Sequence, residues 1–398
     1  MRDRIATRAA QKLALALRDK RILVVCGAGG VGKTTTAAAL GLQAALAGRR
    51  VLVCTIDPSR RLATSLGLDR LLDKPKLLDL SRLAPDARGT LWAMMLDTKR
   101  TFDALVARHT SGEEARRRIL ENRFYRQISS ALAGSHEYMA MEKLLDLSKD
   151  ERFDLVVLDT PPTRHALDFL EAPGRLMGFL DTSVLRWFLK PYFVAGRLTL
   201  KVATRTGALA LNLVDRFLGL QFLQDLSEFF LAFEGMYEGF KERAEKVHAL
   251  LRADGSGFVL VASPVRFTLD EALYFHHRLK QSDMPFVGLV VNRVHPDPSR
   301  ARPADRAPTP QLSPDLDARL AQVLEDQRRL ARAERKSLAR LEVDADEPLV
   351  LVPELEADVH DLRGLLEVGE LILAEAGDAL TRTKPRRTRP ARAAEGNP

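Results

Sequence analysis

The chain has 398 residues, 46% of them hydrophobic and 29% charged, and this balance excludes a fibrous or a wholly disordered protein. The formal net charge is +8, but six basic residues lie between Arg382 and Arg392, in a stretch without any acidic residue. Because the positive excess is concentrated in this tail, it does not indicate a nucleic-acid-binding protein, and we do not expect nucleic acid as a partner.

Short apolar runs alternate with longer helical patterns along the chain, which predicts an α/β fold with a doubly wound, mostly parallel sheet. Runs such as LVVL and FVGLVV are apolar throughout, as expected of strands buried on both faces. Right-handed crossovers bring the carboxyl ends of such strands to one edge, where functional residues are expected. The expected strands are Arg21–Cys26, Val51–Thr55, Leu91–Leu96, Phe153–Leu158, Gly257–Ala262, Phe286–Val291 and Leu349–Val352.

Residues 175–251 lack any strand pattern and are rich in Leu and Phe, which predicts an all-helical subdomain inserted into a domain spanning residues 1–381. Its apolar side chains either pack the helices on one another or form an exposed binding surface. The side chains that would form such an exposed binding surface are Trp187, Phe188, Phe193, Phe217, Phe222, Phe229, Phe230, Phe233 and Met236.

The last third of the chain contains charged and proline-rich segments. A loop is expected over Pro296–Ser313, followed by helices over about Pro314–Leu341 and Asp358–Ala376. The basic segment 382–398 is expected to be disordered, although its charges could also attract nucleic acid or anionic lipid.

The segment GAGGVGKT fits the pattern G-x-x-x-x-G-K-[ST] between a predicted strand and a helix expected over Thr34–Leu46. Its glycines let consecutive N–H groups turn toward an anion, and the helix adds the positive end of its dipole. In such a P-loop, Lys33 bridges the β- and γ-phosphates of a nucleotide and the Thr34 hydroxyl binds Mg²⁺. The candidate phosphate-binding residues are Gly27, Ala28, Gly29, Gly30, Val31, Gly32, Lys33, Thr34 and Thr35.

Two aspartates follow predicted strands at the same edge of the sheet. Asp57 comes just after the second strand, and Asp159 ends the apolar run VVL ahead of Thr160. Carboxylates at this edge would hold Mg²⁺ through water or orient the attacking water. Alone, each could equally be a helix cap or a turn residue, but beside the P-loop the functional interpretation is favoured.

Five segments resemble, in chain order, those of the ArsA-type ATPases: GAGGVGKTTTAAALG, TIDPSRRLATSLG, VVLDTPPTRHALDFLEAP, VVNRV and LVPELEADV. This family comprises arsenite-pump ATPases and ATPases that target tail-anchored membrane proteins, within a wider class of dimeric P-loop switches. The resemblance extends over residues 20–375. It implies a P-loop NTPase fold, ATP and Mg²⁺ as cofactors, ATP hydrolysis and a dimer.

The resemblance also implies roles for matching residues. Asp57 resembles the switch I aspartate that activates the attacking water, and Asp159 opens switch II near Mg²⁺. Asn292 resembles the asparagine that reads the adenine edge, and as a strand-end amide it can both donate and accept hydrogen bonds. Pro353 and Glu354 fall in the loop that packs on the base.

The chain departs from the family at Ala28, where relatives usually carry a lysine that reaches the phosphates of the partner subunit. The missing cation could come from Arg60, Arg61 or Arg164, although surface charge is the ordinary role of such arginines. Alternatively, the chain could pair with a paralogue that retains the lysine. The resemblance therefore leaves both a homodimer and a heterodimer open.

The cysteines bear on partners and location. Cys26 and Cys54 are the only two, they lie in apolar runs, and they form no C-x-x-C pair, so we expect neither the intersubunit zinc of the targeting relatives nor an arsenite site. The N-terminal residues lack a signal peptide, and no stretch is apolar enough to span a membrane, so a cytoplasmic protein is expected.

Three functional hypotheses follow. The first is a Mg²⁺-dependent ATPase whose dimer couples nucleotide state to a hydrophobic client or membrane partner. The second is a nucleotide-binding regulatory subunit with little turnover, because Ala28 replaces the lysine. The third is a subunit of an arsenite pump, which would require stimulation by arsenite.

Overall fold

The computed structural model describes residues 2–57, 61–68, 73–110, 112–122, 125, 135–161, 237–298, 313–344, 349–374 and 376–380. The strands of this part form one eight-stranded sheet in the order β3-β4-β2-β5-β1-β6-β7-β8. Neighbouring strands are parallel except β3, which pairs antiparallel with β4. The strands are β1 (Ile22–Gly27), β2 (Arg50–Thr55), β3 (Lys76–Leu77), β4 (Thr90–Met95), β5 (Leu155–Asp159), β6 (Ser256–Ala262), β7 (Phe286–Val294) and β8 (Leu349–Pro353).

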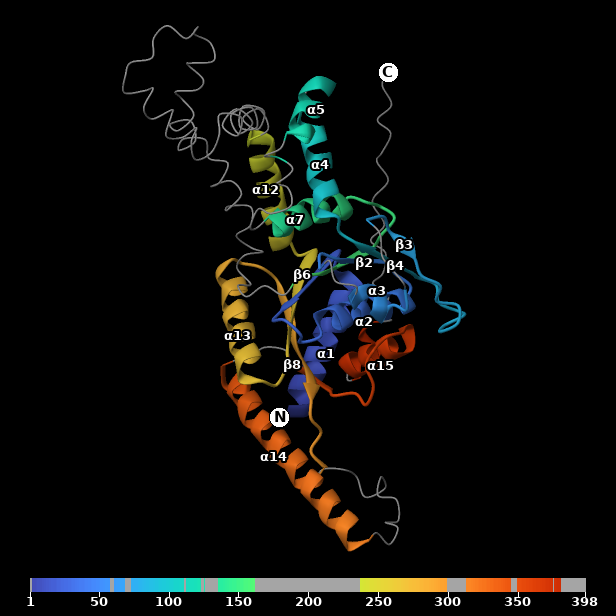
Figure 1. Ribbon diagram of the computed structural model, residues 1–398, viewed down its shortest axis with the longest axis vertical. Helices are drawn as coiled ribbons and strands as arrows, with labels where there is room; N and C mark the ends of the chain where they lie inside the picture. Colours follow the sequence, from blue (N-terminus) through green and yellow to red (C-terminus); the bar gives the residue numbers. More distant parts are fainter. Residues whose placement is uncertain are drawn as a thin grey trace, which may run out of the picture.

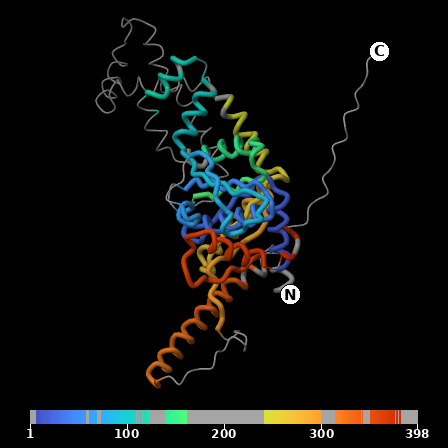
Figure 2. Tube along the Cα trace, turned by 90° about the vertical axis from the view of Figure 1, so that its right-hand side faces the viewer, coloured from blue at the N-terminus to red at the C-terminus, as the bar shows by residue number. Residues whose placement is uncertain are grey.

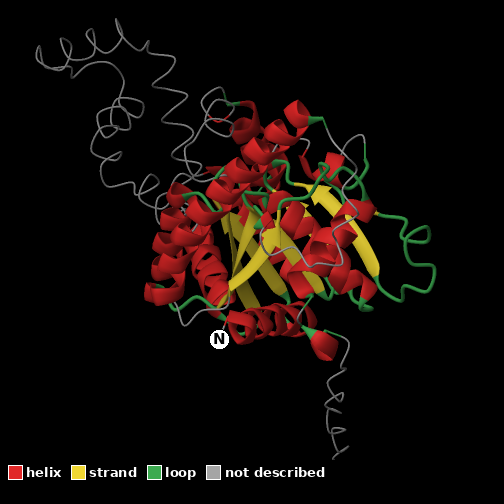
Figure 3. Cartoon of the chain, turned by 90° about the horizontal axis from the view of Figure 1, so that it is seen from below, coloured by secondary structure: helices red, strands yellow, loops and turns green. Residues whose placement is uncertain are grey.

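Helices cover both faces of the sheet, as the view in Figure 3 shows, so the predicted doubly wound, mostly parallel α/β fold is confirmed. Figure 1 places α1, α2 and α15 together in the body of the fold, with α13 on another side of the sheet and α4, α7 and α12 near one end. The helices are α1 (Arg2–Asp19), α2 (Lys33–Leu46), α3 (Arg61–Ser65), α4 (Thr98–His109), α5 (Glu113–Glu121), α7 (Ser135–Ser148), α12 (Tyr237–Arg252), α13 (Arg266–Gln281), α14 (Pro314–Asp344) and α15 (Leu362–Leu373).

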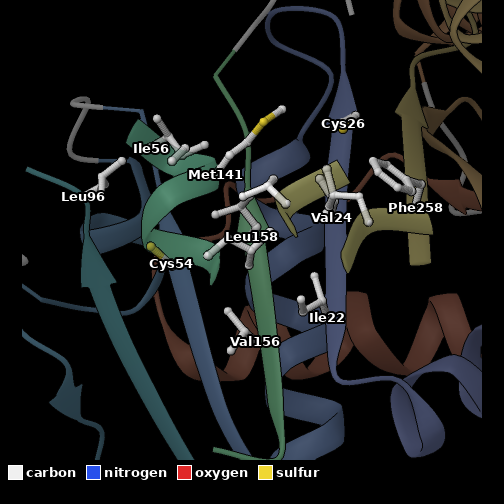
Figure 4. Close-up of a cluster of buried hydrophobic side chains, with 14 of the residues drawn as sticks. Ile22, Val24, Cys26, Cys54, Ile56, Leu96, Met141, Val156, Leu158 and Phe258 are labelled. Atoms are coloured by element: carbon white, nitrogen blue, oxygen red, sulfur yellow. The ribbon is translucent and has the colours of Figure 1, made fainter. Parts of the chain in front are cut away.

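Alternating side chains of the central strand β1 enter two separate hydrophobic cores. Ile22, Val24 and Cys26 pack in the core that includes α4, α7, α12 and α13 (Figure 4). Leu23 and Val25 face the opposite core, which includes α1, α2 and α15. All five side chains are almost completely buried, which explains why this strand reads as a continuous apolar run.

The sheet order places a topological switch at β1. Its neighbours are β5 and β6, so the chain leaves β1 toward β2 on one side and later returns to β6 on the other. Ligands of open α/β sheets bind at the carboxyl edge where such a reversal occurs. The loop after β1 is therefore the expected position of a ligand site.

The structure shifts several predicted element ends. β7 continues to Val294, so Asn292 lies within the strand rather than after it. The last helix begins at Leu362 instead of Asp358, because the carboxylate of Asp361 caps it by accepting from the N–H of Gly364. The short strand β3 and the helix α1 were not predicted from the sequence pattern.

Two elements bear on the predicted domain organisation. The end of the expected helical insertion, residues 237–251, lies in α12, which packs on α7 and β6. Residues 175–236, the basic tail 382–398 and most of the Pro296–Ser313 loop lie outside the described residues. Figures 1 and 2 show α14 extending away from the body of the fold.

Candidate functional site

The loop between β1 and α2 requires glycine at two positions. A side chain at Gly27 would place its Cβ 2.1 Å from the carbonyl oxygen of Val261 on β6. Gly32 has a φ of +95°, and a Cβ there would lie 2.2 Å from Nδ2 of Asn292. Both positions therefore need a residue without a side chain, which lets the loop turn closely around its own N–H groups.

Lys33 begins α2 and points back across the loop. Its ammonium group donates to the carbonyl oxygen of Ala28 over 2.7 Å, and the residue is only 6% exposed. Burial lowers the pKa of Lys33, while the charges of Asp159 and Asp57 act in the opposite direction. The lysine is thus held inside the loop, where a bound phosphate would exchange places with the Ala28 carbonyl.

Asp159 ends β5 directly beneath the loop and is completely buried. Its Oδ2 accepts hydrogen bonds from the hydroxyls of Thr34 and Thr55, each at 2.8 Å. Its Oδ1 is buried and has no hydrogen-bond partner among the described residues. Burial is the main cause that raises the pKa of Asp159 to about 6.

This arrangement fits a magnesium ion. A buried carboxylate oxygen without a partner is costly to retain, and it lies beside the hydroxyl of Thr34. Carboxylate and hydroxyl oxygens are the ligand types that Mg²⁺ prefers. Thr34 and Asp159 are therefore suited to hold the ion, directly or through water.

Asp57 follows β2 and is half-buried beside the same cluster. Its backbone N–H donates to the hydroxyl of Thr55 over 3.2 Å, and that hydroxyl in turn donates to Asp159. Thr55 thus connects the two aspartates, and the sequence analysis missed it. The sequence signal that could have indicated Thr55 is a polar residue at the end of an apolar strand. The sheet register pairs Thr55 with Asp159 on the neighbouring strand β5.

A β-bulge in β7 directs two side chains onto the loop. Between the pairs Val291–Leu351 and Val294–Pro353, β7 has one residue more than β8. Within this bulge, Asn292 Nδ2 donates to the carbonyl oxygen of Val31 over 3.0 Å. Arg293, with a φ of +61°, places Nη1 3.4 Å from the carbonyl oxygen of Gly30. The sequence analysis did not identify Arg293.

Several of these groups line one open cavity of about 960 Å³ at the carboxyl edge of the sheet. The loop and α2 form one wall, α3 a second, the β7 bulge a third, and the segment after β8 the fourth. The lining residues are Gly30, Gly32, Lys33, Thr34, Thr35, Asp57, Arg61, Thr64, Ser65, Asn292, Arg293, Pro353, Glu354, Leu355, Ala357, Asp358, Val359, His360 and Val368.

Most of the predicted site residues therefore lie around a single cavity, although they are up to 324 residues apart in the sequence (Gly30 to Glu354). Asp159 does not line it but lies beneath, hydrogen-bonded to Thr34. The remaining loop residues, Gly27, Ala28, Gly29 and Val31, are likewise not among the lining residues.

The structure describes one of the three arginines considered as replacements for the lysine missing at position 28. Arg61, at the start of α3, lines the cavity, and its positive charge contributes to the lowered pKa of Lys33. Its guanidinium therefore lies within electrostatic reach of Lys33. Arg60 and Arg164 lie outside the described residues.

The fold and the loop define the class of the protein: a doubly wound α/β protein with a phosphate-binding loop at its topological switch point. Comparison with protein families identifies the particular branch. The model of the ArsA ATPase family, described as "Anion-transporting ATPase", matches residues 20–307. The chain belongs to this family, as the sequence resemblance predicted.

The individual relatives carry names of two kinds, arsenical pump-driving ATPase and ATPase GET3. The chain is 27% identical over 288 residues to the "Putative arsenical pump-driving ATPase 1" of Aquifex aeolicus, covering 70% of this chain and 64% of the relative. It is 26% identical over 298 residues to "ATPase GET3C" of Arabidopsis thaliana, covering 71% and 69%. With "ATPase GET3" of Podospora anserina it shares 30% identity over 159 residues, covering 40% and 44%. The matches to the Podospora and Aquifex proteins thus span less than two thirds of those proteins.

Two kinds of feature are absent from the described residues. Within the described ranges, no helix is long and apolar enough to cross a membrane. The same part of the chain contains no group of three or more His, Cys, Asp or Glu side chains placed to hold a metal ion.

Proposed function

We propose that this protein is a Mg²⁺-dependent ATPase that acts as a dimeric switch and couples its nucleotide state to a hydrophobic client or membrane partner. One observation carries the enzymatic part of the proposal. A single cavity is lined by Lys33, Asp57, Asn292 and Glu354, so the residues assigned to the phosphates and those assigned to the base share one space, as binding of a nucleoside triphosphate requires.

Each residue has a chemical task in this proposal. Lys33 leaves the Ala28 carbonyl and binds the β- and γ-phosphates together with the N–H groups of the loop. Thr34 and Asp159 would hold Mg²⁺, which would supply positive charge to neutralise those phosphates. Asp57, half-buried and close to Lys33, orients the attacking water.

The side of the cavity formed by Asn292 and the segment after β8 would take the base. Asn292 already donates one amide hydrogen to Val31, so its second hydrogen and its oxygen remain for the adenine edge. The segment beginning at Pro353 and Glu354 would pack on the base. Because Asn292 also touches the loop through Val31, base recognition and phosphate binding share one side chain.

The dimer and the client remain proposals supported by the family. A protein with Ala28 needs another cation at the transferred phosphate, and Arg61 in this chain or the lysine of a paralogous subunit would supply it. The hydrophobic residues of the predicted insertion would form the client surface. We further propose a cytoplasmic location, since both cysteines are buried and unpaired.

Steady-state hydrolysis of MgATP by the purified chain tests the enzymatic proposal, with Lys33→Ala as the negative variant. We expect phosphate release from the wild-type protein and none from the variant. Equal release from both proteins would overturn the proposal. Adding a paralogue that has the lysine tests the heterodimer, because activity would then appear or increase only in the mixture.

A second candidate is a regulatory subunit that binds nucleotide with negligible turnover. The observation that favours it is Ala28, which cannot supply a cation in trans. It predicts tight MgATP binding without phosphate release, both alone and with a paralogue. Binding by calorimetry together with turnover therefore separates the two candidates.

An arsenite-pump subunit is the third candidate and the least supported by the described residues. Burial raises the pKa of the Cys26 and Cys54 thiols to about 12, so neither supplies the thiolate that a soft metalloid requires. This candidate predicts that arsenite stimulates turnover. We expect no stimulation.

A further inference from the structure

His295, the first residue after β7, lies between two carboxylates from distant elements. Its Nδ1 is 2.7 Å from Oε1 of Glu334 on α14, and its Nε2 is 2.8 Å from Oε2 of Glu354 after β8. Glu334 is nearly buried, with 9% of its side chain exposed, whereas the Glu354 side chain is 47% exposed. The imidazole therefore connects a buried anchor on α14 to an exposed wall of the cavity.

The number of N–H groups on the His295 imidazole decides whether its contacts with both carboxylates can be hydrogen bonds. A neutral imidazole has one N–H, whereas both ring nitrogens here face carboxylate oxygens that only accept hydrogen bonds when ionised. Both contacts are hydrogen bonds when His295 is an imidazolium. Glu334 is fixed independently, because its Oε2 also accepts from the backbone N–H of His295 over 2.9 Å.

The link reaches the nucleotide cavity through Glu354. Besides the imidazole contact, the backbone N–H of Glu354 donates to the carbonyl oxygen of Val294 over 3.0 Å. The segment from Glu354 to His360 forms one wall of the cavity. The bulge residues Asn292 and Arg293, which contact Val31 and Gly30 of the loop, lie three and two residues before His295.

We propose that His295 is a positioning residue: as an imidazolium bridging Glu334 and Glu354, it holds the segment after β8 in place as the base-side wall of the cavity. The proposal rests on the proposed function, because it assumes that the cavity takes a nucleotide. A wall held in its binding position before the ligand arrives raises affinity, since less freedom is lost on binding.

Other charged groups near the link have to be separated from His295 in a test. Asp297 and Arg335 form an ion pair beside it, joining the same strand end to α14. Within the cavity, His360 and the phosphates of the ligand are further polar groups near the same segment. A comparison of variants at the same pH removes these shared contributions.

Two substitutions separate the effect of the positive charge on His295 from the effect of its hydrogen bonds. In His295→Gln the imidazolium is lost, whereas Glu334→Gln suits a neutral histidine: the new amide accepts from the backbone N–H of His295 and donates to its Nδ1. Nε2–H can then still donate to Glu354. His277→Gln, on an exposed position of α13, is the matched control.

The first measurement is calorimetric titration with MgADP at pH 6.5. His295→Gln should bind roughly tenfold more weakly than wild type, the size of one charge-assisted hydrogen bond, and His277→Gln should match wild type. Unchanged affinity in His295→Gln would overturn the proposal.

The second measurement is amide hydrogen exchange of residues 354–360 without nucleotide, which does not depend on the proposed function. At one pH, exchange should be faster in His295→Gln than in wild type and should stay protected in Glu334→Gln. If wild type binds no nucleotide, the proposed function fails, and exchange alone decides whether His295 holds this segment. Equal exchange in all four proteins would refute the role of His295.

Discussion

The ammonium group of Lys33 lies 2.7 Å from the carbonyl oxygen of Ala28, five residues earlier in the same loop. This contact satisfies a nearly buried cation without any ligand. Because a phosphate oxygen is charged and a carbonyl is not, we expect the lysine to prefer the phosphate. If the loop binds a nucleotide, as we propose, the Ala28 contact holds Lys33 beside the phosphates before the ligand arrives.

The first prediction concerns Lys33→Ala. We expect MgATP affinity to fall roughly 100-fold or more, since a charge-assisted contact to phosphate is lost. The free energy of unfolding should change little, because burial already lowers the pKa of this lysine and its loss removes a desolvated charge. Calorimetry and urea denaturation measure the two effects, and Lys246→Ala on the exposed side of α12 is the control.

The second prediction concerns Asp57→Asn. If Asp57 orients the attacking water, turnover should fall by about 10²–10⁴ while MgATP affinity stays within a few-fold of wild type. Phosphate release and calorimetry on the same preparation separate these quantities. Asp86→Asn, an exposed loop substitution, should behave as wild type. A parental turnover rate in Asp57→Asn would remove the assigned role.

The third prediction concerns the pH dependence of stability at Asp159. Its folded pKa of about 6 exceeds the ordinary value of 3.8, so between these values the folded protein binds more protons than the unfolded chain. Asp159 therefore destabilises the ligand-free fold increasingly as pH rises through this window. We expect Asp159→Asn to be more stable than wild type by roughly 1–2 kcal/mol at pH 8, after allowing for one unpaired amide.

The gain in Asp159→Asn should shrink as pH falls toward 4 and disappear below the ordinary value of 3.8, where the carboxyl group is protonated in both states. Urea denaturation at both pH values measures it. Magnesium-dependent turnover should be lost in the same variant, because the buried oxygen that fits the ion is replaced. A stability gain that is independent of pH would contradict this account.

The fourth prediction concerns Arg61. If its guanidinium replaces the cation missing at Ala28, Arg61→Ala should lower turnover by at least tenfold, and by at most the 10³–10⁵ that an arginine finger supplies. Removing the charge should also raise the pKa of Lys33, since Arg61 contributes to lowering it. Arg266→Ala, an exposed substitution on α13, is the control. Unchanged turnover in Arg61→Ala would assign the cation to another residue or subunit.

The sequence was sufficient to predict features that depend on local patterns and on the rules of parallel sheets. The seven expected strands are all present, because buried strands need continuous apolar runs. Lys33, Asp57 and Asn292 line one cavity because parallel strands align their carboxyl ends. These inferences required no knowledge of which side chains touch.

Features that depend on register or on distant partners could not be predicted in this way. Arg293 reaches Gly30 only because β7 has one residue more than β8, and this mismatch is a property of the strand pair. His295 and Glu334 are 39 residues apart, and no pattern in either segment indicates the other. The helix start at Leu362 was missed because Asp361, rather than an earlier residue, caps the helix.

The packing of α1 affects how this protein should be divided into fragments. This helix precedes the family-matched residues 20–307, and it packs on β8, α15 and the short 3₁₀ helix Gly377–Ala379, all of which follow them. An expression boundary drawn at the edges of the match would expose the edge of β7 and strip away the apolar cover of α2. It would also remove Glu354, and we expect such a truncated product to aggregate.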